Sequence, residues 1–247
     1  MPIFIVYLIL ILNFQKPLPT KITSAETLVE AMQKRYSGKW AKTITFVQYN
    51  THYTNDTISG TSIWYEAIAY PDKFRIDFGM PSEGNAVIFA NDSVYNFKTG
   101  QLKASHRQPN NLMLLAGGIY FLPKTEALQR LKDAGYDIKT FHENTWQGKP
   151  AFVVGATKGD LQKPQFWIDK DNLFLVRTLT PTPDHHLQEA QFSKHIKSAG
   201  GWIETEVLFL KDGKKEQLEE YKELKSNPSL PDGLFDPAYF GKVHWMK

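Results

Sequence analysis

Apolar and polar residues alternate with a period of two along most of residues 43–224. Such alternation is typical of antiparallel strands that bury one face of a sheet. It is clearest in segment 73–79, where Phe74, Ile76 and Phe78 share one side and charged residues take the other. Asn-Asp, Tyr-Pro-Asp and Thr-Gly sequences separate the first segments, as expected for tight turns. The pattern predicts strands at about 43–53, 58–68, 73–79, 84–91, 93–98, 101–106, 137–143, 150–157, 164–169, 173–180, 187–197, 201–211 and 214–225.

Helical spacing interrupts this pattern in two places. Residues 26–36 carry apolar side chains three or four positions apart, and a glycine follows the last of them. Thr23 followed by Glu26 has the spacing of a capping box at the start of that helix. A second helix is predicted between Pro123 and Gly135. A long run of strands with two or three helical inserts predicts a mainly β, barrel-like fold.

Residues 112–122 form a strongly apolar segment between the first six strands and the second helix. The segment is too short to span a bilayer, which requires about 20 residues. It contains a Leu-Met-Leu-Leu run and the pair Gly117-Gly118, so it is predicted to be a mobile apolar plug or an ordinary part of the core.

The N-terminal run Ile3 to Leu12 is unbroken and apolar, with the length of a signal-peptide core. Small residues up to Ala25 suit a signal peptidase, so residues 1–25 are predicted to be a signal peptide and 26–247 a single domain. A buried N-terminal strand or a short anchor is the alternative. The chain has no cysteine, which fits an exported protein and excludes a lipid-modified cysteine on the chain itself.

Composition and charge exclude some classes of function. Aromatic residues make up 13% of the chain, enough for a large buried interior. The net charge of +3 comes from 29 basic and 26 acidic residues, too even a balance for a protein that binds nucleic acid. No partner of that kind is expected.

The sequence contains no recognisable catalytic motif. It lacks the nucleophile elbow of hydrolases, the metal-binding helix of zinc proteases, the phosphate-binding loop and the dinucleotide-binding fingerprint. The densest group of candidate ligands is Asp184, His185, His186, Glu189 and His195. Adjacent histidines on a strand point to opposite faces, so they are not expected to share a metal ion. We therefore predict a protein that is not an enzyme and has no catalytic residues, cofactor or metal.

Four short motifs carry a resemblance to a known family. Pro71 to Arg75, Val94 to Phe97, Phe166 to Asp169 and Leu230 to Pro237 resemble, in order and spacing, the LolA-like family of outer-membrane lipoprotein-sorting carriers. The resemblance implies an unclosed, strongly curved antiparallel half-barrel. Its concave face would be apolar and covered by helices that act as a lid. Tyr70 stands where carriers of this family have a basic residue that steadies the lid.

The resemblance also implies a function. It implies a periplasmic, exported monomer that binds the acyl chains of lipoproteins, or a related lipid, and delivers them towards the outer membrane. Inner-membrane donor and outer-membrane acceptor proteins would be its partners. The alternative is an envelope module on the same scaffold that senses lipid or lipoprotein without carrying it.

An apolar cavity is also expected on physical grounds, because exposure of an acyl chain to water costs about 0.8 kcal/mol per CH₂ group. A soluble carrier must bury that chain and then release it. The candidate wall residues are Phe46, Trp64, Phe74, Ile76, Phe78, Phe89, Phe97, Phe166 and Phe174, and the candidate lid residues are Leu112, Met113 and Leu115. The alternative for each of these residues is that it packs in an ordinary hydrophobic core.

Overall fold

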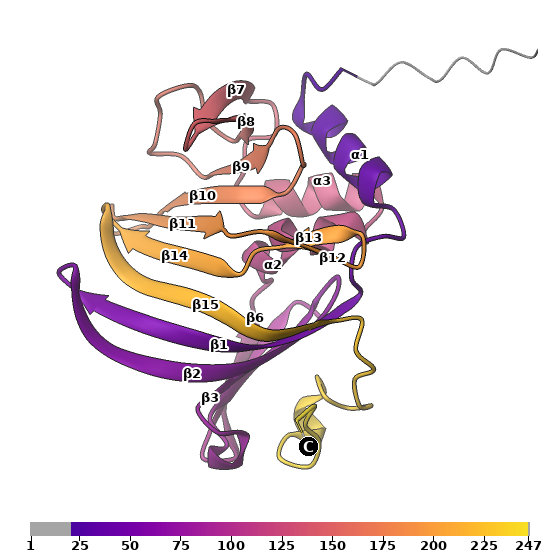
Figure 1. The fold of residues 1–247 in the computed structure, drawn as a ribbon, viewed down its shortest axis with the longest axis vertical. Helices are drawn as coiled ribbons and strands as arrows, with labels where there is room; N and C mark the ends of the chain where they lie inside the picture. The colour runs from indigo at the N-terminus through magenta and orange to yellow at the C-terminus, as the bar shows by residue number, and fades with distance from the viewer. Residues whose placement is uncertain (1–20, 247) are drawn as a thin grey trace, which may run out of the picture.

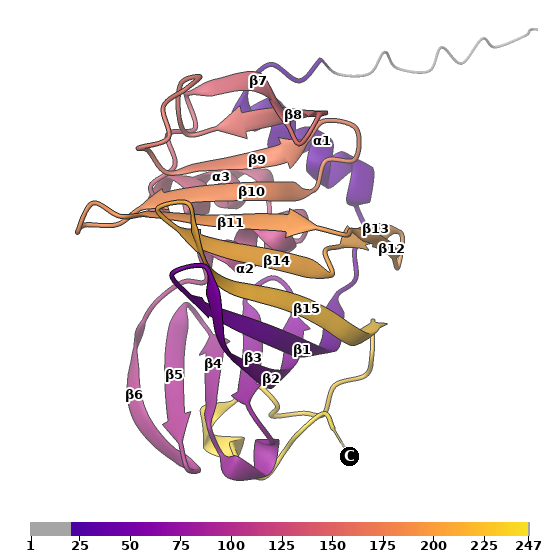
Figure 2. The same ribbon diagram turned by 60° about the vertical axis from the view of Figure 1, so that its left-hand side comes forward.

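The computed structural model describes residues 21–246, so most of the predicted signal peptide 1–25 lies outside the described residues. Thirteen strands form one antiparallel sheet that bends strongly without closing (Figures 1 and 2). The strand order is β6-β5-β4-β3-β2-β1-β15-β14-β11-β10-β9-β8-β7, which leaves β6 and β7 as the two edges. The predicted mainly β, unclosed half-barrel is confirmed.

Alternating burial shapes each strand, and most bounds agree with the predicted segments. The strands of this sheet are β1 (Thr43–Thr54), β2 (Thr57–Ala69), β3 (Lys73–Phe78), β4 (Ala86–Ala90), β5 (Ser93–Lys98), β6 (Gln101–Arg107), β7 (Phe141–Trp146), β8 (Lys149–Val154), β9 (Gln165–Asp169), β10 (Leu175–Pro181), β11 (Leu187–Ser193), β14 (Glu206–Lys211) and β15 (Lys214–Ser226).

The helices cover one face of the sheet over the half that contains β7 to β11 (Figure 1). They are α1 (Ala25–Tyr36), α2 (Asn111–Ala116) and α3 (Lys124–Asp133), with short 3-10 turns η1 (Pro81–Glu83), η2 (Gly118–Tyr120) and η3 (Pro237–Tyr239). Helix α1 packs against α3 and η2. Their apolar side chains and those of β8 to β11 form the main core.

The start of α1 differs from the predicted cap. Ser24 is the N-cap, and its Oγ accepts a hydrogen bond from the Thr27 backbone N–H at 3.2 Å. The Thr27 hydroxyl in turn accepts from the Ser24 N–H at 3.0 Å. The capping box is therefore one residue later than Thr23 and Glu26 suggested, because threonine can close the box in place of glutamate.

Two predicted strands are interrupted. The chain leaves the main sheet at Lys194, where φ is 51°, and β12 (Ile196–Ser198) pairs with β13 (Gly201–Ile203) as a separate two-stranded sheet. It rejoins the main sheet only at Glu206. The predicted continuous strands 187–197 and 201–211 are therefore wrong at this break, and the connection that contains Glu204 lies outside the ladder.

The predicted strand 137–143 also starts later than expected. Asp137 forms a turn in which its backbone carbonyl accepts from the Thr140 N–H at 3.0 Å and its carboxylate accepts from the Thr140 hydroxyl at 2.6 Å. β7 begins only after this turn, at Phe141.

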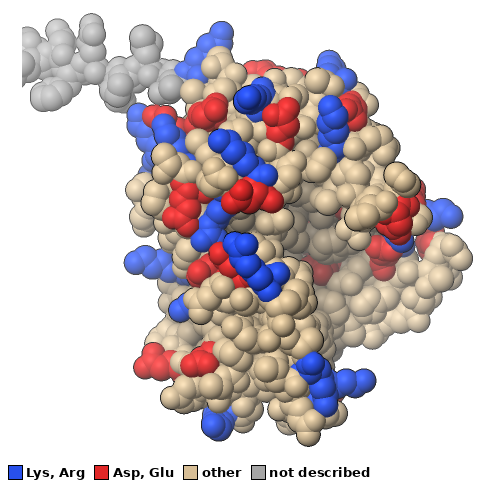
Figure 3. Space-filling model, turned by 180° about the vertical axis from the view of Figure 1, so that it is seen from behind, with Lys and Arg blue, Asp and Glu red and all other residues tan. Residues whose placement is uncertain are grey.

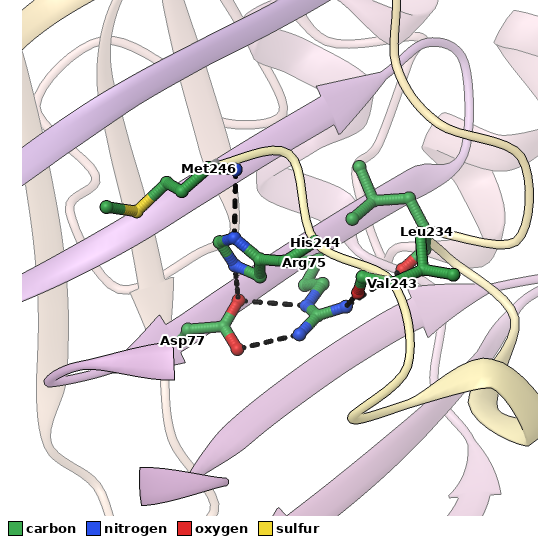
Figure 4. A network of polar contacts seen from close by, with 6 residues as sticks. All are labelled: Arg75, Asp77, Leu234, Val243, His244 and Met246. Carbon is green, nitrogen blue, oxygen red and sulfur yellow. Dashed lines mark hydrogen bonds and ion pairs between the residues drawn. The ribbon is translucent and has the colours of Figure 1, made fainter. Parts of the chain in front are cut away.

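The C-terminal segment covers the opposite, convex face of the sheet at β3 to β5. Beneath it, Arg75 and Asp77 form a buried ion pair with Nε–Oδ2 and Nη2–Oδ1 distances of 2.8 and 2.9 Å (Figure 4). His244 lies 3.0 Å from the same carboxylate, and the Val243 carbonyl accepts from Arg75 at 2.9 Å. Burial alone would raise the pKa of Asp77, but hydrogen bonds from His244 and Arg75 hold it below the ordinary value. This network attaches the end of the chain to the sheet.

We predict that Asp77→Asn lowers the free energy of unfolding by about 3–5 kcal/mol, because it leaves the Arg75 guanidinium buried without its counter-charge. Chemical denaturation of purified variants measures the effect. Asp232→Asn, at an exposed position of the same C-terminal segment, is the matched control and should change stability little. A loss below about 1 kcal/mol for Asp77→Asn would show that the ion pair does not stabilise the fold.

Candidate ligand pocket

An apolar pocket lies between the helix-covered face of the sheet and α2, with a cavity volume of about 80 Å³. The sheet register places its wall residues side by side, since Phe46 of β1 faces Glu66 of β2 and Ile68 of β2 faces Phe74 of β3. The pocket is lined by Ile44, Phe46, Glu66, Ile68, Tyr70, Phe74, Asn110, Leu112, Met113, Ala116, Phe192, Ile203, Glu204 and Tyr221.

The structure brings together only some of the predicted site residues. Phe46, Phe74, Leu112 and Met113 line the pocket. Phe89 pairs with Phe74 but lines a separate cleft of about 670 Å³ beside α2 and α3, which Met113 also lines.

Three further predicted wall residues continue the same sheet face beyond the pocket. Trp64 pairs with Phe78 in the β2–β3 register, and their ring centroids are 4.9 Å apart. Ile76 lies between them and the pocket, opposite Glu66.

The other four predicted residues lie outside this pocket. Phe97 points to the convex face, where its ring stacks on Phe240 at 3.9 Å. Phe166, Phe174 and Leu115 belong to the main core beneath the helices. The alternation of side chains along β5 explains why Phe97 points to the convex face. The periodicity of β9 and β10, in contrast, does not indicate that helices cover these strands.

The predicted lid segment 112–122 divides into two parts with different surroundings. Its second part is fixed in the core, because Ile119 is fully buried and the Tyr120 hydroxyl donates to the Leu173 carbonyl at 2.7 Å. Gln33 of α1 also donates to the carbonyls of Ile119 and Leu122 at 2.9 and 2.8 Å. Only α2 contributes residues of this segment to the pocket.

The glycine pair serves close packing. A Cβ on Gly117 would lie 2.2 Å from the Tyr70 ring, and one on Gly118 would lie 2.9 Å from the Pro71 carbonyl oxygen. Tyr70 also stacks on Phe121, with ring centroids 5.5 Å apart. An aromatic contact therefore connects the end of β2 to the segment around α2, at the position where a basic residue was expected from the family resemblance.

Three acidic side chains that the sequence analysis missed gather around the pocket. Glu66 is 2% exposed and lines the cavity, and no hydrogen bond or ion pair to its carboxylate is found among residues 21–246. Glu204 lines the cavity from the break between β13 and β14. Glu219 of β15 is buried nearby and accepts hydrogen bonds from Gln217 at 2.8 Å and from Tyr221 at 3.0 Å.

Burial changes the protonation of all three groups. Burial raises the pKa of Glu66 well above its ordinary value, and the nearby Glu219 adds to the effect. Burial raises the pKa of Glu204 to about 7. The pKa of Glu219 is also raised by burial, against the opposing hydrogen bonds from Tyr221, Gln48 and Gln217. A low-dielectric site disfavours the charged carboxylate, so the uncharged form is favoured up to neutral pH.

A space-filling view from behind shows a hollow in the molecule, with an acidic patch visible inside it (Figure 3). Basic side chains occupy the surrounding surface rather than the interior of the hollow (Figure 3). No ion pair of Glu66, Glu204 or Glu219 with a basic side chain occurs in the described part of the chain, which is consistent with their raised pKa values.

The histidine-rich segment forms no common site. His186 Nδ1 contacts the Asp212 carboxylate at 2.5 Å, whereas His195 is stacked on Phe174 with ring centroids 3.8 Å apart. In residues 21–246 no group of three metal-ligating side chains comes together. Within the same residues, none of the helices has the length and apolar character needed to cross a membrane.

We predict that Gly117→Ala lowers the free energy of unfolding by about 1–3 kcal/mol, because the new Cβ overlaps the Tyr70 ring and forces repacking. Thermal or chemical denaturation measures the loss. Gly60→Ala is the matched control, since a Cβ there meets no atom within 4 Å. Equal stability of the two variants would show that the contact between Tyr70 and Gly117 is not tight.

The pH dependence of stability tests the protonation of the pocket. A carboxyl whose pKa is raised on folding stabilises the fold below its ordinary pKa of 4.5, and this contribution disappears as pH rises through the folded value, about 7 for Glu204. Glu66→Gln removes one such group. The variant should therefore gain stability relative to wild type as pH rises from 5 to 8, by about 1.4 kcal/mol per unit of pKa difference.

The difference between variant and wild type is the quantity to measure, because His195 contributes an opposite slope. Burial lowers the pKa of His195 to about 4, which destabilises the fold as pH falls. Denaturation curves at each pH give the comparison. A difference in stability that does not change with pH would mean that Glu66 titrates normally in the folded protein.

Comparison with known proteins shows what this fold is similar to. No family model and no curated protein matches the sequence. A DUF1329 family protein from Desulfovibrio piger matches with a TM-score of 0.60 and 16% identity, over 87% of this chain and 97% of that one. A putative outer membrane lipoprotein-sorting protein domain from Vibrio parahaemolyticus matches with a TM-score of 0.58 and 12% identity, over 87% and 97%.

A LolA superfamily protein from Nitrosomonas europaea matches with a TM-score of 0.56 and 11% identity, over 88% of this chain and all of that one. At such identities the likeness concerns the fold. The coverage extends along nearly the whole of each neighbour, so it is not restricted to a few strands. The chain therefore has the half-barrel fold of the LolA superfamily and of outer-membrane lipoprotein-sorting domains.

Proposed function

We propose that the protein is an exported periplasmic carrier that binds the acyl chains of lipoproteins, or of a related lipid, and delivers them towards the outer membrane. The observation that supports this most directly is the apolar pocket between the sheet and α2, whose wall includes Phe46, Phe74 and Ile203. The similarity in fold to a lipoprotein-sorting domain supports the same function.

The size of the pocket indicates how loading would occur. Its volume of about 80 Å³ is far below the 300–1,000 Å³ of typical ligand pockets. An acyl chain therefore requires that the side chains of α2 leave the cavity. Leu112, Met113 and Ala116 are the α2 residues that line it. Methionine adapts readily to different apolar surfaces, which suits a wall that contacts either protein or lipid.

The proposed activity is reversible binding, without bond making or breaking. Burial of each CH₂ group contributes about 0.8 kcal/mol, and this free energy would act against the contacts that hold α2 in the cavity. Release would require a partner that accepts the acyl chain, and loading would require one that donates it. We place the donor at the inner membrane and the acceptor at the outer membrane, and the carrier acts as a monomer between them.

We predict that Ala116→Phe reduces the lipid or lipopeptide retained by the protein several-fold, because the new ring fills the cavity. Native mass spectrometry of protein purified from the cell envelope measures the retained ligand. Ala238→Phe is the matched control, since Ala238 is exposed in η3 and does not line the pocket. Wild-type protein without any bound lipid or lipopeptide, or equal loading of both variants, would contradict the proposal.

A further inference from the structure

The unusual feature of the pocket is a buried acid in an apolar wall. Glu66 occupies an inward position of β2 between Trp64 and Ile68, and its neighbours across the ladders are Phe46 and Ile76. Its carboxylate has no hydrogen-bond partner among the described residues. A buried polar group without a partner destabilises the fold, whereas a leucine at the same position would carry no such penalty.

The nearby amide groups are already engaged. Gln48 Nε2 donates to Asn50 Oδ1 at 2.7 Å, and Gln217 Nε2 donates to the same oxygen at 2.9 Å. Gln217 Nε2 also donates to Glu219. The side-chain amide of Gln217 thus supplies a hydrogen bond to Glu219, the acidic residue on β15. Glu66 and Glu204 also line the cavity, so their carboxyl groups are placed to accept a hydrogen bond from a ligand that fills the pocket.

We propose that Glu66 and Glu204 bind an ammonium group carried near the polar end of the acylated ligand, an inference that rests on the proposed carrier function. The apolar wall holds the alkyl chain, and the two carboxyls receive the N–H donors. An ammonium group supplies both the missing hydrogen bonds and the missing positive charge. A hydroxyl group supplies only a hydrogen bond, and a carboxylate or phosphate brings neither an N–H donor nor a positive charge to pair with an ionised pocket carboxyl.

Binding of such a ligand is coupled to proton release. The titratable groups that face Glu66 are Glu204, Glu219 and Tyr221, together with Tyr70 at the end of β2, and none of them is cationic. The residues of β3 and α2 that line the pocket are apolar: Phe74, Leu112, Met113 and Ala116. When the ammonium group enters, a carboxyl proton leaves to solvent and the resulting carboxylate accepts the ligand N–H. Affinity should therefore rise with pH until the pocket carboxyls are ionised.

Dodecylammonium, dodecanol and dodecanoate test the inference, because they share one alkyl chain and differ only in the head group. Below their micelle concentrations, wild-type protein should bind the ammonium compound at least about tenfold more tightly than the alcohol, the factor that corresponds to 1.4 kcal/mol. Titration calorimetry in buffers of different ionisation enthalpy should show proton release with dodecylammonium and none with dodecanol.

Glu66→Gln should remove most of this preference and of the proton release while leaving dodecanol binding unchanged. Glu204→Gln should also reduce the preference for ammonium and the proton release. It replaces Glu66→Gln as the test variant if circular dichroism shows that Glu66→Gln does not fold. Glu220→Gln is the matched control, since Glu220 lies next to Glu219 on β15, on the opposite face, and pairs with Lys222. It should behave as wild type.

Two negative results have different meanings. If all three compounds bind with equal affinity, the pocket takes alkyl chains but the assignment of Glu66 and Glu204 is overturned. If none binds, the proposed carrier function is overturned as well. An unchanged preference for ammonium in Glu66→Gln and Glu204→Gln would also overturn the assignment.

Two paired ligands identify the source of the amine. One pair is phosphatidylethanolamine and phosphatidylglycerol with identical chains, and the other is a diacylated lipopeptide with a free or an acetylated α-amino group. If the protein prefers phosphatidylethanolamine and Glu66→Gln abolishes that preference, the ligand is an aminophospholipid. If it prefers the lipopeptide with the free α-amino group and Glu66→Gln abolishes that preference, the ligand is a lipoprotein. Equal binding within both pairs would overturn the inference.

Discussion

The central constraint on this structure is a sheet that bends strongly and does not close. A closed barrel pairs all its strands and fills its own interior, whereas this sheet ends at β6 and β7 and leaves its inner face to be covered by other elements. Helices α1 and α3 cover the half that contains β8 to β11, and the C-terminal segment covers the outer face of β3 to β5. In the described part of the chain, the inner face beside β1 to β3 is covered at the pocket by the six-residue helix α2 and by Ile203 at the end of β13.

The thin covering of this region leaves room for the apolar pocket that we propose as the ligand site. The buried ion pair of Arg75 and Asp77 beneath the C-terminal segment is satisfied within the protein, by the hydrogen bond with His244 as well as by the pairing itself. In the pocket, Glu66 is buried without such a partner, and burial raises its pKa well above the ordinary value. A site that keeps an unsatisfied acid beside a nearly filled cavity is typical of a binding surface rather than of a finished core.

The sequence was sufficient for the fold but only partly for the site. Period-two alternation located most strands because each has one buried face, and Phe46 and Phe74 follow directly from it. The helices that cover Phe166 and Phe174 depend on packing between distant segments, which no local pattern contains. Glu66 could have been found from the sequence, because an acidic residue at an inward strand position between Trp64 and Ile68 predicts a carboxyl group on the apolar face of the sheet. Glu204 depends on the strand break after β13, which the alternation hides.

The pair Gly117 and Gly118 can be interpreted either as a flexible hinge or as a site of close packing. Glycines after an apolar run favour a flexible hinge when only the sequence is considered. In the structure, Gly117 admits the Tyr70 ring and Gly118 admits the Pro71 carbonyl, so both hold the segment close to the end of β2. For the proposed carrier function, this contact places any opening of the pocket on its N-terminal side, in α2. Because Met113 lines both the pocket and the larger cleft beside α3, displacement of this one side chain would join the two spaces.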